Sequence, residues 1–130
     1  MSDMTLARRW LSRAQDDLLV ARHVFEDLHP KQLEISCYQS HQAAEKAMKA
    51  YLILNDYEYP FTHDLVKLCQ LCLEFNEGFD ALLDDCADLS PYATQARYPN
   101  EIPIDEAKTQ AALLKAERIV ALCESLIEAK

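Results

Sequence analysis

Residues 34–55 read EISCYQSHQAAEKAMKAYLILN, and this stretch decides the fold. It contains neither Gly nor Pro, so it predicts one helix of roughly 30 Å, about the width of a small domain. Its polar side chains form one narrow line, namely Gln39, Gln42, Lys46 and Lys49. The rest of its circumference is mostly apolar or small, which is typical of a helix buried against several neighbours. We therefore expect this stretch to be the central helix of a bundle.

An amphipathic helix is expected before this stretch, from about residue 3 to residue 28. Its apolar stripe is Leu6, Trp10, Ala14, Asp17/Leu18, Ala21 and Phe25. The helix should end at His29-Pro30, because the residue before a proline is pushed out of the α region. Asp16 or Asp17 lies either on the solvated face or opposite a neighbouring helix, and we favour the solvated position.

Three further helical segments are expected after the central helix. Thr62 predicts the N-cap of a third helix, which Gly78 closes. The fourth segment, residues 79–97, is interrupted at Ser90-Pro91, where serine as N-cap and proline at the first helical position indicate a restart. A loop at 98–104 precedes a last helix that Asp105 caps, with the stripe Ala107, Ala111, Leu114, Arg118/Ile119, Leu122 and Leu126. The prediction is an all-α, antiparallel up-and-down bundle of about five helices, in a single domain of residues 1–130.

The composition fits a folded domain and narrows the classes of function. The chain has 130 residues, half of them hydrophobic, and a single glycine, which argues against a Gly-rich phosphate loop. No apolar run is long enough for a membrane span, and residues 1–11 lack the apolar core of a signal peptide, so we expect a cytoplasmic protein with no membrane contact. The net charge of −9 disfavours non-specific nucleic-acid binding but leaves room for a local basic groove.

The five cysteines have no disulfide-framework spacing, so we expect buried free thiols. Cys69 and Cys72 form a lone CxxC motif. A zinc site needs two further ligands, and a redox site needs a preceding strand, and the sequence shows neither context. We assign no metal ligand and no cofactor.

Three places concentrate side chains that could bind phosphate by charge-assisted hydrogen bonds. The candidate ligand-binding residues are His41, Lys46, Lys49, His63, Arg97 and Tyr98. Each place also has a structural explanation: a histidine between helices for His41, N-terminal capping for His63, and a helix C-terminus for Arg97. Glu45 and Lys46 each fit one half of an ion pair. Glu45, four residues after His41, could instead orient that histidine as a base, although this spacing is common by chance. We assign no catalytic residue.

Four motifs in this order resemble those of the HEPN domain, the helical domain named for nucleotide binding in prokaryotes and higher eukaryotes. They are AQDDLLVA at 14–21, CYQSHQAAEKAMKAYL at 37–52, THDL at 62–65, and Tyr92 followed by RYP at 97–99. The resemblance covers nearly the whole chain. It implies an antiparallel helical bundle, usually a homodimer. Stand-alone prokaryotic members often accompany a minimal nucleotidyltransferase in a toxin–antitoxin or related two-component system.

Many members of this family are metal-independent RNases that carry Arg, four to six residues, then His. Here no histidine follows Arg97, and the histidine beside Arg22 is adjacent, so we expect this motif to be absent. The leading hypothesis is a non-enzymatic HEPN-type binding module that forms a homodimer, pairs with a minimal nucleotidyltransferase and binds nucleotide or RNA. One alternative is a metal-independent RNase toxin with an irregular catalytic set, using His41 or His63 as base. The other is a ligand-free dimeric scaffold.

Overall fold

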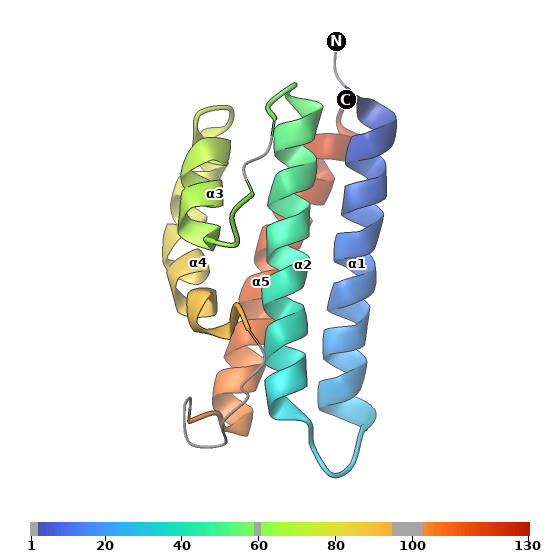
Figure 1. Ribbon diagram of the computed structural model, residues 1–130, viewed down its shortest axis with the longest axis vertical. Helices are drawn as coiled ribbons and strands as arrows, with labels where there is room; N and C mark the ends of the chain where they lie inside the picture. Colours follow the sequence, from blue (N-terminus) through green and yellow to red (C-terminus); the bar gives the residue numbers. More distant parts are fainter. Residues whose placement is uncertain (1–2, 59–60, 95–102) are drawn as a thin grey trace.

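The helices of the computed structural model, which describes residues 3–58, 61–94 and 103–130, form the predicted all-α bundle (Figure 1). The long helices are α1 (Met4–Asp27), α2 (Leu33–Leu54) and α5 (Glu106–Glu128). α1 runs antiparallel to α2 and α5, and the shorter α3 (Leu65–Leu73) and α4 (Leu83–Leu89) lie on the side of α2 away from α1. Within the described ranges, no helix is long and apolar enough to cross a membrane.

α2 occupies the centre of the bundle, as its composition predicted. Fifteen of its 22 residues are buried, so it meets neighbours around almost its whole circumference. Small side chains let α1 approach closely, and the Ser36 hydroxyl donates a 2.8 Å hydrogen bond to the Ala21 carbonyl of α1. On the other side, the ring of Tyr51 lies 5.2 Å from the ring of Phe79. These contacts hold α2 in place, and α2 carries the polar side chains of the candidate site.

The buried stripes of α1 and α5 agree with the predicted ones in part: Ala14 and Ala21 are buried as predicted, whereas other buried positions lie one residue away. α1 buries Ala7, Leu11, Ala14, Ala21 and Val24, whereas the predicted Leu6 is 37% exposed. α5 buries Ile119 as predicted, but Leu114 is 45% exposed and the neighbouring Leu113 is buried instead. One residue turns a helix by about 100°, so these differences amount to a partial rotation of each helix about its axis.

The turn before α3 differs from the prediction in which residue caps the helix. The N-cap is Asp64, whose carboxylate accepts the backbone amides of Val66 at 3.1 Å and Lys67 at 3.2 Å. The predicted cap, Thr62, instead accepts the backbone amide of Asp64 at 3.1 Å. The helix also ends earlier than the predicted Gly78. It ends at Leu73, because the Asn76 side chain then opens a 3₁₀ helix, Glu77–Leu82.

The predicted interruption of the fourth helix is confirmed, although Ser90 does not have the predicted role of an N-cap. α4 gives way to a 3₁₀ turn, Ser90–Tyr92, that contains Pro91. Ser90 is not an N-cap, because its hydroxyl donates to the Cys86 carbonyl at 2.9 Å and so ends α4. The expected continuation to residue 97, and most of the expected loop at 98–104, lie outside the described residues. Asp105 caps α5 as predicted, accepting the backbone amide of Lys108.

All five cysteines are buried free thiols, as predicted. Burial raises the pKa of the Cys72 and Cys123 thiols well above the ordinary value, so both stay protonated and unreactive at neutral pH. In the part of the chain that the structure describes, no group of three His, Cys, Asp or Glu side chains is arranged to hold a metal ion.

Candidate functional site

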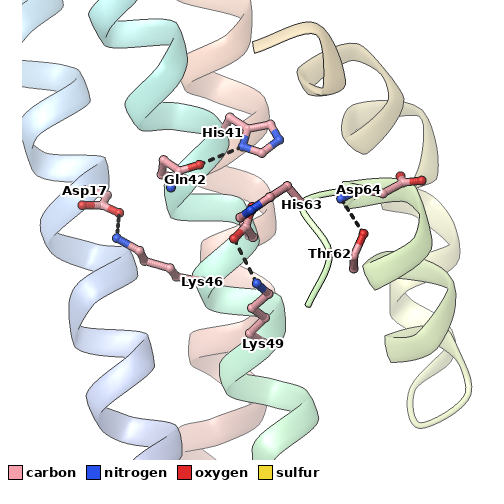
Figure 2. A network of polar contacts seen from close by, with 9 residues as sticks. Asp17, His41, Gln42, Lys46, Lys49, Thr62, His63 and Asp64 are labelled. Carbon is pink, nitrogen blue, oxygen red and sulfur yellow. Dashed lines mark hydrogen bonds and ion pairs between the residues drawn. The ribbon is translucent and has the colours of Figure 1, made fainter. Parts of the chain in front are cut away.

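A buried carboxylate, that of Glu45, is the centre of the main polar site, which we call the Glu45 cluster: Glu45, Lys49, His63 and the neighbouring His41. Figure 2 shows how Lys49, His63 and His41 lie in this cluster. Lys49 Nζ donates to Glu45 Oε2 at 3.0 Å, and His63 Nδ1 lies 2.9 Å from Glu45 Oε1. The Glu45 and Lys49 side chains are only 5% and 6% exposed. One carboxylate thus joins a buried ion pair to a histidine from the segment before α3.

Local sequence explains how these side chains meet. Glu45 and Lys49 are four residues apart on α2, and this spacing places them on one helical face. His63 arrives between Thr62 and Asp64, and the capping hydrogen bonds of those two residues fix the backbone around it. Two sets of contacts therefore position His63. The capping hydrogen bonds before α3 hold its backbone, and Glu45 holds its ring.

His63 is the member of the cluster that faces solvent, with a side chain 73% exposed. Because the carboxylate of Glu45 can only accept, the ring carries its proton on Nδ1 and presents Nε2 outward. In the neutral form Nε2 is an acceptor or base, and in the protonated form it is a donor for an anion such as phosphate. The same geometry therefore serves either ligand binding or proton transfer.

His41 is a buried residue between helices, in agreement with its structural explanation. Its ring is fully buried, Nδ1 lies 3.2 Å from Gln42 Oε1, and Nε2 has no hydrogen-bond partner among the described residues. Burial lowers the pKa of His41, and the hydrogen bond to Gln42 and the charge of Glu45 only partly oppose this. The suggested pairing of His41 with Glu45 as base and orienter does not form, because Glu45 orients His63 instead.

Lys46 points away from the Glu45 cluster, toward α1 (Figure 2). Its Nζ lies 2.6 Å from Asp17 Oδ2, with the two side chains 28% and 19% exposed. Of the two aspartates, Asp16 is exposed, as favoured, whereas Asp17 forms the alternative, an ion pair with a neighbouring helix. Lys46 is thus one half of an interhelical ion pair, as its alternative explanation proposed.

The structure brings together three of the six candidate residues, His41, Lys49 and His63. They lie around Glu45, which was not one of the six. Glu45 was weighed only as an ion-pair partner or an orienter, although its i, i+4 spacing to Lys49 was a usable signal. Arg97 and Tyr98 lie outside the described residues.

Comparison with known proteins gives the same family as the sequence motifs. The family profile of the HEPN domain matches residues 7–126. The chain belongs to the HEPN domain family. A comparison with curated proteins finds no match.

Two solved structures share this HEPN fold. The crystal structure of ST0689, an archaeal HEPN homologue, is 23% identical with a TM-score of 0.73, covering 93% of this chain and 97% of that one. The crystal structure of TT1696 from Thermus thermophilus is 24% identical with a TM-score of 0.79, covering 92% of this chain and 96% of that one. At these identities the likeness shows the fold alone.

The arginine–histidine spacing of HEPN RNases does occur once here, contrary to the prediction. Six residues separate Arg22, near the end of α1, from His29 in the following turn. The Arg22 side chain pairs with Glu117 of α5, which neutralises its charge, and His29 is exposed. This pair lies at the end of the bundle where α1 turns into α2, whereas Glu45 lies halfway along α2.

Proposed function

We propose that this HEPN domain is a non-enzymatic binding module that forms a homodimer and pairs with a minimal nucleotidyltransferase in a toxin–antitoxin-like system. The observation that carries the proposal is the Glu45 cluster. Its buried charges neutralise each other, and the exposed His63 ring is held in one orientation, as suits a fixed contact to a phosphate of nucleotide or RNA. The arginine and histidine of the RNase spacing lie elsewhere, with the arginine paired.

The partner is tested by isolating the affinity-tagged chain from a lysate of its native host and recording native mass spectra of the eluate. The expected species is a dimer carrying a small nucleotidyltransferase. A bare dimer would remove the partner from the proposal, and a monomer would remove the dimer as well.

The ligand is tested by titrating ATP into the protein by calorimetry. His63→Ala should weaken binding by about tenfold, the value of one charge-assisted hydrogen bond. His23→Ala is the matched control, because His23 is also exposed and also lies 2.8 Å from a carboxylate, that of Asp27. Equal affinities for wild type and His63→Ala would contradict the ligand role. If no nucleotide binds or shifts the melting temperature, the ligand-free scaffold is the better description, since a ligand at a hundred times its Kd adds about 2.7 kcal/mol.

A second candidate function, metal-independent RNA cleavage, is favoured by one observation, the 2.9 Å contact between Glu45 and His63. A carboxylate that fixes the ring of an exposed histidine is the arrangement of a general base and its orienting group. In this reaction His63 Nε2 takes the proton of a 2′-hydroxyl, the 2′-oxygen attacks the phosphorus, and the 5′-oxygen leaves with a proton from water.

Cleavage of end-labelled RNA in the presence of a chelator tests this function. Activity should disappear in His63→Ala and persist in His23→Ala. Activity that needs magnesium, or that survives both His63→Ala and His41→Ala, would rule out this catalytic set. Loss in His29→Ala alone would assign cleavage to Arg22 and His29 instead.

A further inference from the structure

His63 differs from the other three histidines of the chain in how its ring is held. Its Nδ1 lies 2.9 Å from Oε1 of Glu45, whose side chain is 5% exposed, while its own side chain is 73% exposed. His23 also lies beside a carboxylate, that of Asp27, but both of these side chains are 61% exposed, so water competes for their contact. His63 therefore combines an open ring nitrogen with a fixed, buried partner.

The two remaining histidines each lack one of these properties. His41 is fully buried, so a reagent in solution does not reach its ring. His29 is exposed, and within the described ranges its ring has no hydrogen-bond partner that would fix it. An open ring held by a buried carboxylate is thus found at His63 and at none of the other three.

The contact with Glu45 decides which ring nitrogen of His63 can react. Because a carboxylate ion only accepts hydrogen bonds, Nδ1 of the neutral ring carries the proton and Nε2 keeps its lone pair. This lone pair is the nucleophile with which a histidine forms covalent intermediates. When Nε2 attacks, positive charge develops on the ring, and the carboxylate of Glu45 lies where it stabilises that charge. No proton has to leave the ring during the attack.

The other charged groups around the ring support this reaction. Lys49 donates to Glu45 through the other oxygen, Oε2, at 3.0 Å, so Oε1 stays directed at His63. Asp64 follows His63 directly, and a carboxylate there could repel an anionic reagent. It accepts the backbone amides at the start of α3 instead, and it points away from the His63 ring (Figure 2).

We propose that His63 is a phosphoryl-acceptor site that is phosphorylated on Nε2 by donors of the phosphoramidate class. Nε2 attacks the phosphorus and forms a new N–P bond. The N–P bond of the donor breaks, and its electron pair leaves on the donor nitrogen, which is protonated in phosphoramidate at neutral pH and departs as ammonia. The product is a ring with a positive charge facing Glu45 and a dianionic phosphoryl group on Nε2.

Exposure to water favours a phosphoryl group over an acyl group at this position. An N-acyl imidazole hydrolyses quickly, whereas an N-phosphoryl imidazole persists at neutral pH, so a ring that is 73% exposed retains only the second. A phosphoramidate donor is suited to this acceptor because the bond that breaks is of the same kind as the bond that forms. The transfer is then nearly balanced in free energy and needs no further co-reactant.

Incubation of the protein with potassium phosphoramidate at neutral pH tests the site. Phosphorus NMR distinguishes a phosphoryl group on Nδ1 from one on Nε2, and peptide mass spectrometry under alkaline conditions locates it. His63 should be labelled on Nε2 about tenfold faster or more than His23 and His29, since a charge-assisted hydrogen bond stabilises its transition state. His63→Ala should lose this signal, and the matched control His23→Ala should keep it. Equal rates at the three residues, or label on Nδ1 of His63, would overturn the proposal.

Removing the carboxylate separates its effect from simple exposure of the ring. Glu45→Ala combined with Lys49→Met removes both buried charges together, so no unpaired ammonium is left in the core. In this double variant, checked for folding by circular dichroism, His63 should react about tenfold more slowly and on both ring nitrogens. Asp27→Asn is the matched control, because its exposed carboxylate should change the rate at His23 by less than about twofold. An unchanged rate and unchanged Nε2 selectivity in the folded double variant would overturn the role of Glu45.

This site and the proposed function share the His63 ring, but their failures are distinguishable. The labelling reaction contains no nucleotide, so selective labelling of His63 in a protein that does not bind ATP would keep the acceptor site and remove the ligand role. Normal ATP binding without selective labelling would overturn the acceptor site and leave the proposed function in place.

Discussion

Removing the Glu45 carboxylate should destabilise the domain more than any other single change in its polar site. Glu45→Ala leaves the Lys49 ammonium in a position that is only 6% exposed, without the partner that now lies 3.0 Å away. Breaking a buried ion pair from one side costs about 3–5 kcal/mol, because the remaining buried charge loses its counter-charge. The bond to His63 adds little, since that ring is 73% exposed and screened by water.

We therefore expect Glu45→Ala to lower the free energy of unfolding by about 3 kcal/mol. In a chain of 130 residues this corresponds to a fall in Tm of roughly 10–15 °C. Urea unfolding followed by circular dichroism measures the first quantity, and a thermal scan measures the second.

Two controls make the reasoning refutable. Glu26→Ala removes an exposed carboxylate from α1 and should change stability by less than about 0.5 kcal/mol. Adding Lys49→Met to Glu45→Ala removes the buried ammonium and should recover most of the loss, because an apolar pair often replaces a buried ion pair at no cost. A loss below about 1 kcal/mol in Glu45→Ala, or a double variant no more stable than the single one, would refute the role given to this buried charge pair.

Three further outcomes test other parts of the structure. Burial lowers the pKa of His41 below its ordinary 6.5, so unfolding takes up a proton as the pH falls through 6.5 and the folded state loses stability there. The urea midpoint should thus fall more steeply on acidification in wild type than in His41→Leu, and parallel falls would contradict this. Because all five thiols are buried, a thiol reagent should show no fast phase with the native protein, and a burst of reaction would mean that at least one of them is accessible. Arg118→Ala removes two 2.9 Å hydrogen bonds to Asp85 and should cost about 1 kcal/mol at low salt and less at high salt, since Arg118 is 55% exposed; no salt dependence would argue against the pair.

Local sequence signals predicted the helices well where a single residue type had one strong preference. Asp105 is followed directly by a helix-forming stretch and caps α5, and Pro91 marks the break after α4. At the start of α3, however, Thr62 and Asp64 are both good N-cap residues. The choice between them depended on where α3 packs, which no local pattern contains.

The hydrophobic periodicity could not predict which face of α1 and of α5 is buried, for a similar reason. α1 offers apolar rows at Leu6 and Trp10 and at Ala7 and Leu11, and α5 offers both Leu113 and Leu114. Adjacent rows differ little in hydrophobicity, so the pattern alone cannot separate them. Which row is buried depends on how the side chains of each helix interdigitate with those of α2, and this is a property of the packed bundle.

The sequence by itself determined the helical class and the central place of α2, because a helix that is apolar around most of its circumference has no other stable position. It also indicated the pair of Glu45 and Lys49, because side chains four residues apart on a helix are neighbours whatever the fold around them. Only the tertiary structure decided that Glu45 contacts His63, 18 residues away, and that Lys46 pairs with Asp17, 29 residues away. Such partners depend on how helices rotate and where turns end, and those are set by packing over the whole core.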